Sequence, residues 1–211
     1  MTISSETKFF LGILLTTIVI IATAMIFLSR PVPTLTLPKE TLIPASAHTK
    51  GNKDAKVYLV EFSDFQCPAC AAFGPIVESL VEKNKNELLF VYRHYPLPKH
   101  QFAIPSALAA ESASVQGKFW EAAAYLFANQ DKFSDTLWDT MATDLTLDKA
   151  QFIKDMTAQT GKSTIDQDLS LATALNLPGT PTFFLNGALM KNLNTPQDLI
   201  AAVEAAITGT K

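Results

Sequence analysis

The stretch EFSDFQCPAC, residues 61–70, holds the only two cysteines of the chain. Before it, residues 56–62 (KVYLVEF) are nearly continuous in apolar, β-branched and aromatic character, as expected of a buried strand. After it, residues 68–85 carry apolar side chains at helical spacing, and residues 88–92 (LLFVY) form a second strand-like run. This order predicts a βαβ unit with parallel strands, in which the cysteine pair lies where the first strand gives way to the helix.

After this unit, the spacing of apolar residues first becomes typical of helices and later returns to that of strands. Residues 101–176 contain only helix-like segments, namely 103–116, 118–129, 134–144, 148–160 and 163–175. A hairpin then follows around Asn186-Gly187, a strong turn signal, and a last helix is predicted from Thr195 to Ile207. We therefore predict an α/β sheet whose first half spans residues 56–100, whose second half spans 177–211, and which is interrupted by a helical subdomain.

The N-terminal segment is predicted to anchor the protein in a membrane. Residues 9–28 (FFLGILLTTIVIIATAMIFL) are an uncharged run of 20 residues, and a helix of that length rises ~30 Å, the thickness of the hydrocarbon core. A cleavable signal peptide is the alternative, but its apolar region normally spans only ~7–15 residues. We expect residues 1–8 to be cytoplasmic and the proline-containing residues 29–55 to form a linker.

The charge of the chain argues against nucleic acid as a partner. Lysine and arginine number 17 against 20 acidic residues, which gives a net charge of −3. The sequence has no basic run, so the electrostatic footprint of a nucleic-acid-binding protein is missing. We expect no nucleic-acid partner and no cofactor.

The position of the cysteine pair predicts a reactive thiol. At a helix N-terminus, free N–H groups and the helix dipole stabilise a thiolate and lower its pKa below the usual ~8.5. Pro68 suits the first helical position, where a missing N–H costs nothing. Cys67 is then the exposed nucleophile, and Cys70, one turn deeper, resolves the mixed disulfide. Because such chemistry needs an oxidising compartment, we expect the domain to lie on the extracytoplasmic side, in the periplasm or at the cell exterior.

Other interpretations of the pair remain open. A zinc site would need four ligands, and His94 and His100 could complete it, but they fall at a strand end and in a loop, so we predict no metal. Two inert core cysteines are another alternative, although a turn that opens a helix is an unusual place for them. A permanent structural disulfide would close too small a ring to stabilise the fold much.

Three segments together resemble the thioredoxin superfamily, and within it the DsbA-like thiol oxidases of bacterial cell envelopes. They are residues 61–70, the stretch Gly179-Thr180-Pro181-Thr182-Phe183-Phe184, and residues 116–130, which begin Gln-Gly-Lys-Phe-Trp-Glu. The resemblance covers residues 45–211. It implies a thioredoxin-like fold with an inserted helical subdomain, to which the apolar run of residues 9–28 adds one preceding N-terminal transmembrane helix.

The resemblance also implies a substrate-binding loop. In the family the proline of this loop is cis, so Pro181 is expected to face Cys67 and to turn the backbone of Thr180 toward an extended substrate segment. Pro68 and Ala69, between the cysteines, are expected to contact the substrate as well. The alternative for residues 179–181 is a simple turn.

A buried acid is implied in the same way. Glu61 matches a family position beneath the disulfide, where a raised carboxyl pKa would let it relay the proton of Cys70. The alternative is an edge position open to water. Tyr92, Tyr95 and His94 are further candidates for the rim of the site.

The leading hypothesis is a disulfide donor that oxidises reduced exported proteins and is itself reoxidised by a DsbB-like or VKOR-like membrane partner. Ala69 stands where the best-known oxidases carry a histidine that stabilises the thiolate, so the direction of electron flow stays open. A membrane-tethered thiol reductase is the alternative within the same chemistry. A chaperone or a copper-binding module is the alternative outside it, since two thiolates suit copper(I).

Overall fold

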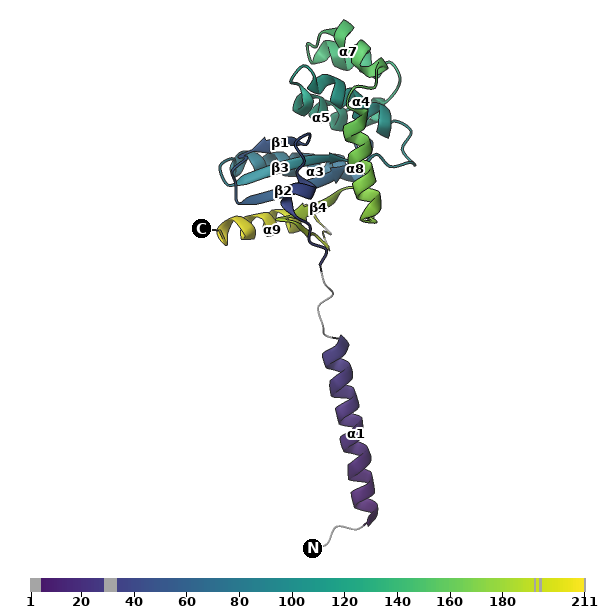
Figure 1. The fold of residues 1–211 in the computed structure, drawn as a ribbon, viewed down its shortest axis with the longest axis vertical. Coiled ribbons are helices and arrows are strands. Elements are labelled where there is room, and N and C mark those ends of the chain that lie inside the picture. Colours follow the sequence, from purple (N-terminus) through teal and green to yellow (C-terminus); the bar gives the residue numbers. More distant parts are fainter. Residues whose placement is uncertain (1–4, 29–33, 192, 194, 211) are drawn as a thin grey trace. The chain divides into compact units, whose positions relative to one another are not determined.

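The computed structural model describes residues 5–28, 34–191, 193 and 195–210, which fall into two units, Met1–Thr34 and Leu35–Lys211. In the first unit, residues Ser5–Leu28 form helix α1 (Figure 1). A helix is therefore confirmed over residues 9–28. The transmembrane segment predicted there is not confirmed: over the described ranges, no helix has both the length and the apolar character needed to span a membrane.

The second unit is built on a five-stranded sheet. Its central strand, β2 (Val57–Ser63), is parallel to β3 (Leu88–His94) on one side, as the predicted βαβ unit requires. On the other side β2 is antiparallel to β4 (Thr182–Leu185). Both outer strands are antiparallel to their neighbours. The strand order is β1-β3-β2-β4-β5, with β1 (His48–Gly51), β2 (Val57–Ser63), β3 (Leu88–His94), β4 (Thr182–Leu185) and β5 (Ala188–Leu189).

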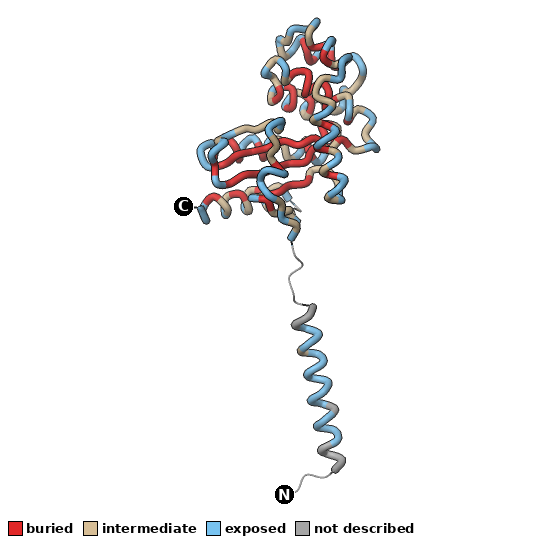
Figure 2. The backbone as a smooth tube through the Cα atoms, viewed as in Figure 1, coloured by how far each residue is buried: buried red, intermediate tan, exposed pale blue. Residues whose placement is uncertain are grey.

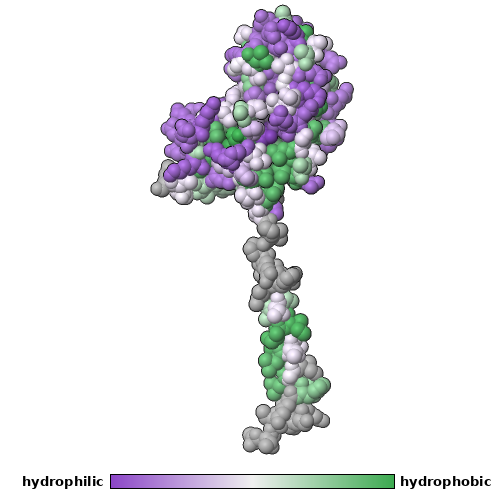
Figure 3. All heavy atoms as spheres, in the orientation of Figure 1, coloured by the Kyte–Doolittle hydropathy of each residue, from purple (hydrophilic) through white to green (hydrophobic). Residues whose placement is uncertain are grey.

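Helices cover both faces of the sheet, so its central strands are buried (Figure 2). α3 (Pro68–Lys83) and α9 (Pro196–Thr208) pack on the face to which β2 directs Leu59. α2 (Lys39–Leu42) and α8 (Lys162–Ala174) lie on the other face, which receives Val60 and Phe62. This burial on both sides explains the nearly continuous apolar run of β2. The outer surface is mainly hydrophilic on the face shown in Figure 3.

The helical insertion lies between β3 and β4, as predicted. It consists of α4 (Ala103–Ser114), α5 (Phe119–Ala128), the short 3₁₀ helix η1 (Gln130–Lys132), α6 (Leu137–Asp144) and α7 (Lys149–Thr157), and α8 leads back to the sheet. Its buried residues Phe119, Leu126 and Phe152 belong to the same hydrophobic cluster as Leu59 of β2. The insertion therefore extends the core of the sheet.

The predicted linker over residues 29–55 is wrong for its second part. Thr36 forms a bridge with Ala188, Leu42 is fully buried, and the strand His48–Gly51 pairs with β3. These residues are held by backbone hydrogen bonds at the sheet edge and by scattered apolar side chains such as Leu42 and Ala55, so their sequence shows no strand periodicity. Residues 29–33 lie outside the described residues.

The C-terminal hairpin and helix follow the predicted signals. Asn186 and Gly187 both have positive φ, 48° and 87°, as the turns of tight two-residue hairpins require. Thr195 caps α9 by accepting a hydrogen bond from the Asp198 amide, and Pro196 occupies its first position. These elements place β4, and with it the loop before β4, beside β2.

Candidate active site

The cysteine pair lies at the predicted junction of β2 and α3. Cys67 is the N-cap residue of α3, and Pro68 is its first residue. Both thiols are free. Cys67 is 6% exposed and Cys70 is fully buried, whereas Pro68 and Ala69 between them are exposed. Of the two thiols, only Cys67 keeps some exposed surface, but it is largely buried and not the exposed nucleophile predicted from the sequence.

The loop before β4 faces this pair. The Thr180–Pro181 peptide bond is cis, and the Cys67 Sγ lies 3.3 Å from the Thr180 carbonyl oxygen, to which the protonated form of the thiol donates a hydrogen bond. The sheet register explains the approach, because Thr182 pairs with Phe62 in β2, five residues before Cys67. The cis bond inferred from the resemblance is confirmed, and the interpretation of residues 179–181 as a simple turn is wrong.

The two thiols have opposite electrostatic environments. The pKa of Cys67 is lowered to about 5, chiefly by a hydrogen bond from the Cys70 thiol. The side chain of Thr180 and the amides of Cys70 and Ala69 also favour the thiolate, whereas burial opposes the shift. Burial, followed by the neighbouring Cys67 thiolate and the charge of Glu61, raises the pKa of Cys70 well above its ordinary value. Cys67 is therefore a thiolate at neutral pH while Cys70 keeps its proton.

Glu61 lies beneath the pair, in the central strand. It is 3% exposed, pairs with Tyr92 of β3 and Phe183 of β4, and accepts a hydrogen bond of 2.6 Å from the Ser63 hydroxyl. Burial raises the pKa of its carboxyl to about 7, which the Ser63 hydrogen bond partly offsets. The buried acid is confirmed, and the alternative of an edge position open to water is wrong.

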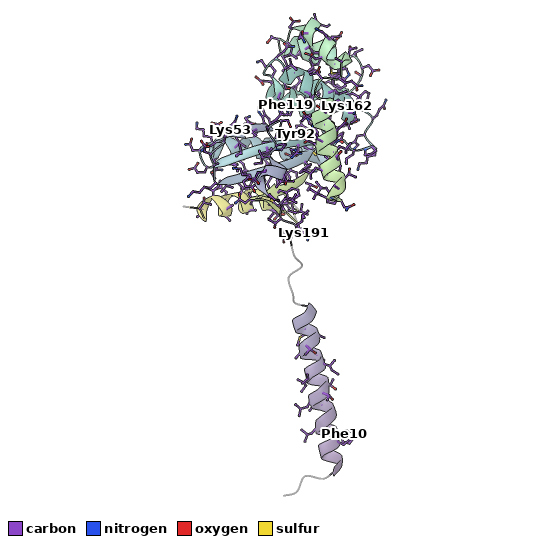
Figure 4. All side chains as sticks on the ribbon, viewed as in Figure 1. Phe10, Lys53, Tyr92, Phe119, Lys162 and Lys191 are labelled. Carbon is purple, nitrogen blue, oxygen red and sulfur yellow. The ribbon has the colours of Figure 1, made fainter. Side chains whose placement is uncertain are left out.

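Tyr92 is the one rim candidate that belongs to this site. It lies where the sheet meets the insertion, beside Phe119 (Figure 4), and its buried hydroxyl has no hydrogen-bond partner among the described residues. Burial and the charges of Cys70 and Glu61 raise its pKa. Tyr92 and Glu61 both line a cavity of about 680 Å³ between α3 and α5.

The other two rim candidates point elsewhere. The Tyr95 hydroxyl donates to the Leu177 carbonyl, and His94 Nε2 lies 2.8 Å from the Glu111 carboxylate. His100, the second candidate for a zinc ligand, contacts Asp64. Neither histidine is grouped with the cysteines as a set of metal ligands among the residues described.

Gln130 supports the active-site loop from the insertion, a role that its place in the sequence does not reveal. Its Nε2 donates to the Phe65 carbonyl at 2.7 Å and to the Cys67 carbonyl at 2.9 Å. Both carbonyls belong to the turn between β2 and α3, so Gln130 fixes this turn across 63 residues of sequence.

Asp64, the residue directly after β2, supports the same turn. Its buried carboxylate accepts hydrogen bonds from the amides of Gln66 at 2.8 Å and Leu97 at 2.9 Å, and contacts His100 Nδ1 at 2.7 Å. The position just before a CxxC pair is its only signal in the sequence.

Comparisons with known proteins agree with this geometry. Residues 45–205 match the thioredoxin family. Among curated proteins, the chain is 36% identical over 185 residues to a Na⁺/H⁺ antiporter NhaA 1 of Mycolicibacterium vanbaalenii, covering 85% of this chain. It is 35% identical over 193 residues to another from Salinispora arenicola, covering 90% of this chain. The chain spans only 30% and 29% of the length of these two relatives.

Solved structures of similar fold include a thioredoxin-like oxidoreductase from Silicibacter pomeroyi, with 30% identity, a TM-score of 0.68 and coverage of 81% of this chain and 98% of that one. The thiol–disulfide exchange protein α-DsbA2 from Wolbachia pipientis has a TM-score of 0.71 at 18% identity, with 80% and 91% coverage. BdbD from Bacillus subtilis has a TM-score of 0.67 at 21% identity, with 83% and 97% coverage. The chain therefore belongs to the thioredoxin family, and its fold is that of the DsbA-like thiol–disulfide oxidoreductases.

Proposed function

We propose that this chain is a thiol–disulfide oxidoreductase that donates the Cys67–Cys70 disulfide to reduced exported proteins. The observation that carries the proposal is the pKa of Cys67, lowered to about 5 beside a thiol whose pKa is raised. A stabilised thiolate favours the reduced form of the pair, and this makes the corresponding disulfide an oxidant.

The transfer proceeds in two exchange steps. A substrate thiolate attacks the Cys67 sulfur of the disulfide, a substrate–Cys67 bond forms, and Cys70 leaves with the electron pair and takes up a proton. A second substrate thiolate then attacks the substrate sulfur of this mixed disulfide and expels Cys67. The substrate is oxidised by two electrons and the pair is reduced. The low pKa of Cys67 makes it a good leaving group in the second step.

Glu61 is suited to supply the proton that Cys70 takes up. With a pKa of about 7 its carboxyl is partly protonated at neutral pH, and it lies close enough to the buried thiol for its charge to raise the pKa of Cys70. General acid catalysis is most effective when the pKa lies near the working pH. Both groups are buried, at 3% and 0% exposure, so this proton transfer is shielded from bulk water.

The loop of Pro181 is suited to hold the substrate. A pocket of about 340 Å³ adjoins it, lined by Pro178, Pro181, Thr182, Phe183, Leu189, Met190, Lys191 and Leu193. The exposed Pro68 and Ala69 border the reactive sulfur on the other side. An unfolded segment that adds to this loop as a strand would put its own cysteine at Cys67, with an apolar side chain in the pocket.

The location and the partners belong to the same proposal. A disulfide donor works where thiols are oxidised, so we place the domain outside the cytoplasm, with a DsbB-like or VKOR-like membrane protein to reoxidise it. The antiporter names give no activity to this chain, which spans less than a third of those proteins.

The experiment that tests the proposal is capture of mixed disulfides. Cys70→Ala removes the resolving thiol. Its Cys67 is first converted to a mixed disulfide with glutathione by added oxidised glutathione; thiolates of reduced exported proteins should then attack the Cys67 sulfur, expel glutathione and leave covalent adducts that Cys70 cannot resolve. Non-reducing electrophoresis followed by mass spectrometry identifies them. The matched control carries Cys67→Ala as well and should yield none. A chaperone or a copper-binding module would bind its partners without adducts, and their absence from a thiol-rich envelope extract would contradict the proposal.

A further inference from the structure

A second cluster of reactive side chains lies apart from the cysteines. It consists of His48 in β1, His94 in β3 and Glu111 in α4. His48 Nε2 lies 2.7 Å and His94 Nε2 lies 2.8 Å from the same oxygen, Glu111 Oε1. One ligand atom from each residue lies within 4.8 Å of the other two. Three elements distant in sequence thus direct two imidazoles and a carboxylate at one point.

Aromatic packing fixes the orientation of both imidazole rings. The ring of His48 stacks on Phe119, with centroids 3.4 Å apart and an angle of 9° between the planes. The ring of His94 meets Phe65 and Tyr92 edge to face. Ligands held in place by their neighbours bind a metal without a large loss of conformational entropy.

The cluster is closed toward the protein and open on one side. The side chains of His94 and Glu111 are 1% and 7% exposed, whereas that of His48 is 18% exposed. Gly161 borders the carboxylate: a Cβ there would lie 2.4 Å from the Glu111 Cβ and 2.7 Å from its Oε2. A glycine at this position leaves room for the carboxylate, and the open side leaves room for a water molecule.

We propose that His48, His94 and Glu111 bind a zinc ion, with water as the fourth ligand. Two histidines and one carboxylate suit Zn²⁺, which binds them at about 2.0–2.2 Å in a tetrahedral arrangement. Neighbouring ligand atoms in such a site are about 3.3 Å apart, so each nitrogen–oxygen pair must separate by about half an ångström, which the partly exposed His48 allows. Hard cations such as Mg²⁺ and Ca²⁺ prefer oxygen ligands and are not expected to bind.

This site would join the sheet to the insertion. His48 and His94 lie on the neighbouring strands β1 and β3, and Glu111 lies on the first helix of the insertion. Because the metal binds only the folded arrangement of these elements, it would stabilise the protein against unfolding. The inference goes beyond the proposed function, and its failure would leave the disulfide chemistry untouched.

The test uses the full chain with Cys67 and Cys70 oxidised to a disulfide, so that no thiolate competes for the metal. Titration with Zn²⁺ in a calorimeter should show one ion per chain. His48→Ala should weaken the affinity on the order of 100-fold, because each ligand supplies a large share of the binding free energy. His100→Ala is the matched control, since it removes a partly buried histidine that contacts Asp64, and it should leave the affinity unchanged.

Two further measurements do not depend on that variant. Co²⁺ bound to the unaltered protein should show the visible absorption of a four-coordinate site, and Zn²⁺, unlike Mg²⁺, should raise the melting temperature. Glu111→Gln keeps a hydrogen-bonding side chain of the same shape and should still weaken Zn²⁺ binding at least about tenfold. Absence of zinc binding, or equal affinity in the unaltered protein and in folded His48→Ala and Glu111→Gln, would overturn the proposal and leave the cluster a hydrogen-bonded link only.

Discussion

Replacement of Glu61 by glutamine should change how the stability of the oxidised protein depends on pH. Burial moves the pKa of this carboxyl from 4.5 to about 7 in the folded protein, so between these pH values the folded state binds more protons than the unfolded state. The free energy of unfolding must then fall as the pH rises through this window. Each tenfold change in proton affinity is worth about 1.4 kcal/mol, so the whole effect is about 3 kcal/mol. The glutamine side chain does not titrate, so the Glu61→Gln variant should not show this fall.

The assay is urea denaturation of both proteins between pH 4.5 and 8, with the cysteines oxidised so that no thiolate titrates. Glutamine preserves the size of the side chain and can still accept the Ser63 hydrogen bond, which keeps packing changes small. The stability of the unaltered protein relative to the variant should fall by about 3 kcal/mol across the range, and the difference cancels titration common to both. A constant difference would refute the assignment of a buried, proton-holding carboxyl.

Three further predictions concern the thiolate, the loop support and the core. In the reduced protein, thiolate absorbance at 240 nm should appear with a midpoint near pH 5 for Cys67; a midpoint near 9 would contradict the assignment of Cys67 as a stabilised thiolate. Gln130→Ala removes the hydrogen bonds to the Phe65 and Cys67 carbonyls, so it should cost ~1–3 kcal/mol in urea denaturation and raise the thiolate midpoint. Gln116→Ala, which loses hydrogen bonds far from the cysteines, should leave that midpoint unchanged. Leu126→Ala empties a fully buried core position and should cost ~2–5 kcal/mol, measured in the same way.

Elements with a hydrophobic period could be predicted from the sequence. The helix after Cys67 and the helices of the insertion show helical spacing of apolar residues. The strands containing Glu61 and Tyr92 are instead continuous apolar runs, because both of their faces are buried. Prolines and glycines mark several of their ends. The reactive pair was also predictable, since two cysteines at a strand–helix junction are close in sequence.

Contacts made across long stretches of sequence could not be predicted in the same way. The strand His48–Gly51 is short, polar and at the edge of the sheet, so its pairing with β3 depends on backbone hydrogen bonds that leave no pattern of side chains. Gln130 reaches the active-site loop, and Glu111 reaches His48, only because the insertion packs on the sheet. The spacing of residues in the sequence does not indicate such contacts.

The reduction potential of the Cys67–Cys70 couple, measured in glutathione buffers at pH 7, decides whether this chain can act as a disulfide donor. A Cys67 pKa lowered from 9.0 to about 5 stabilises the dithiol at pH 7 by roughly 3 kcal/mol, which makes the couple several tens of millivolts more oxidising than one with an unshifted thiol. We predict a potential above about −200 mV, toward the roughly −120 mV of strong oxidases. A value near the roughly −270 mV of thioredoxin would contradict the donor role and make the protein a reductant.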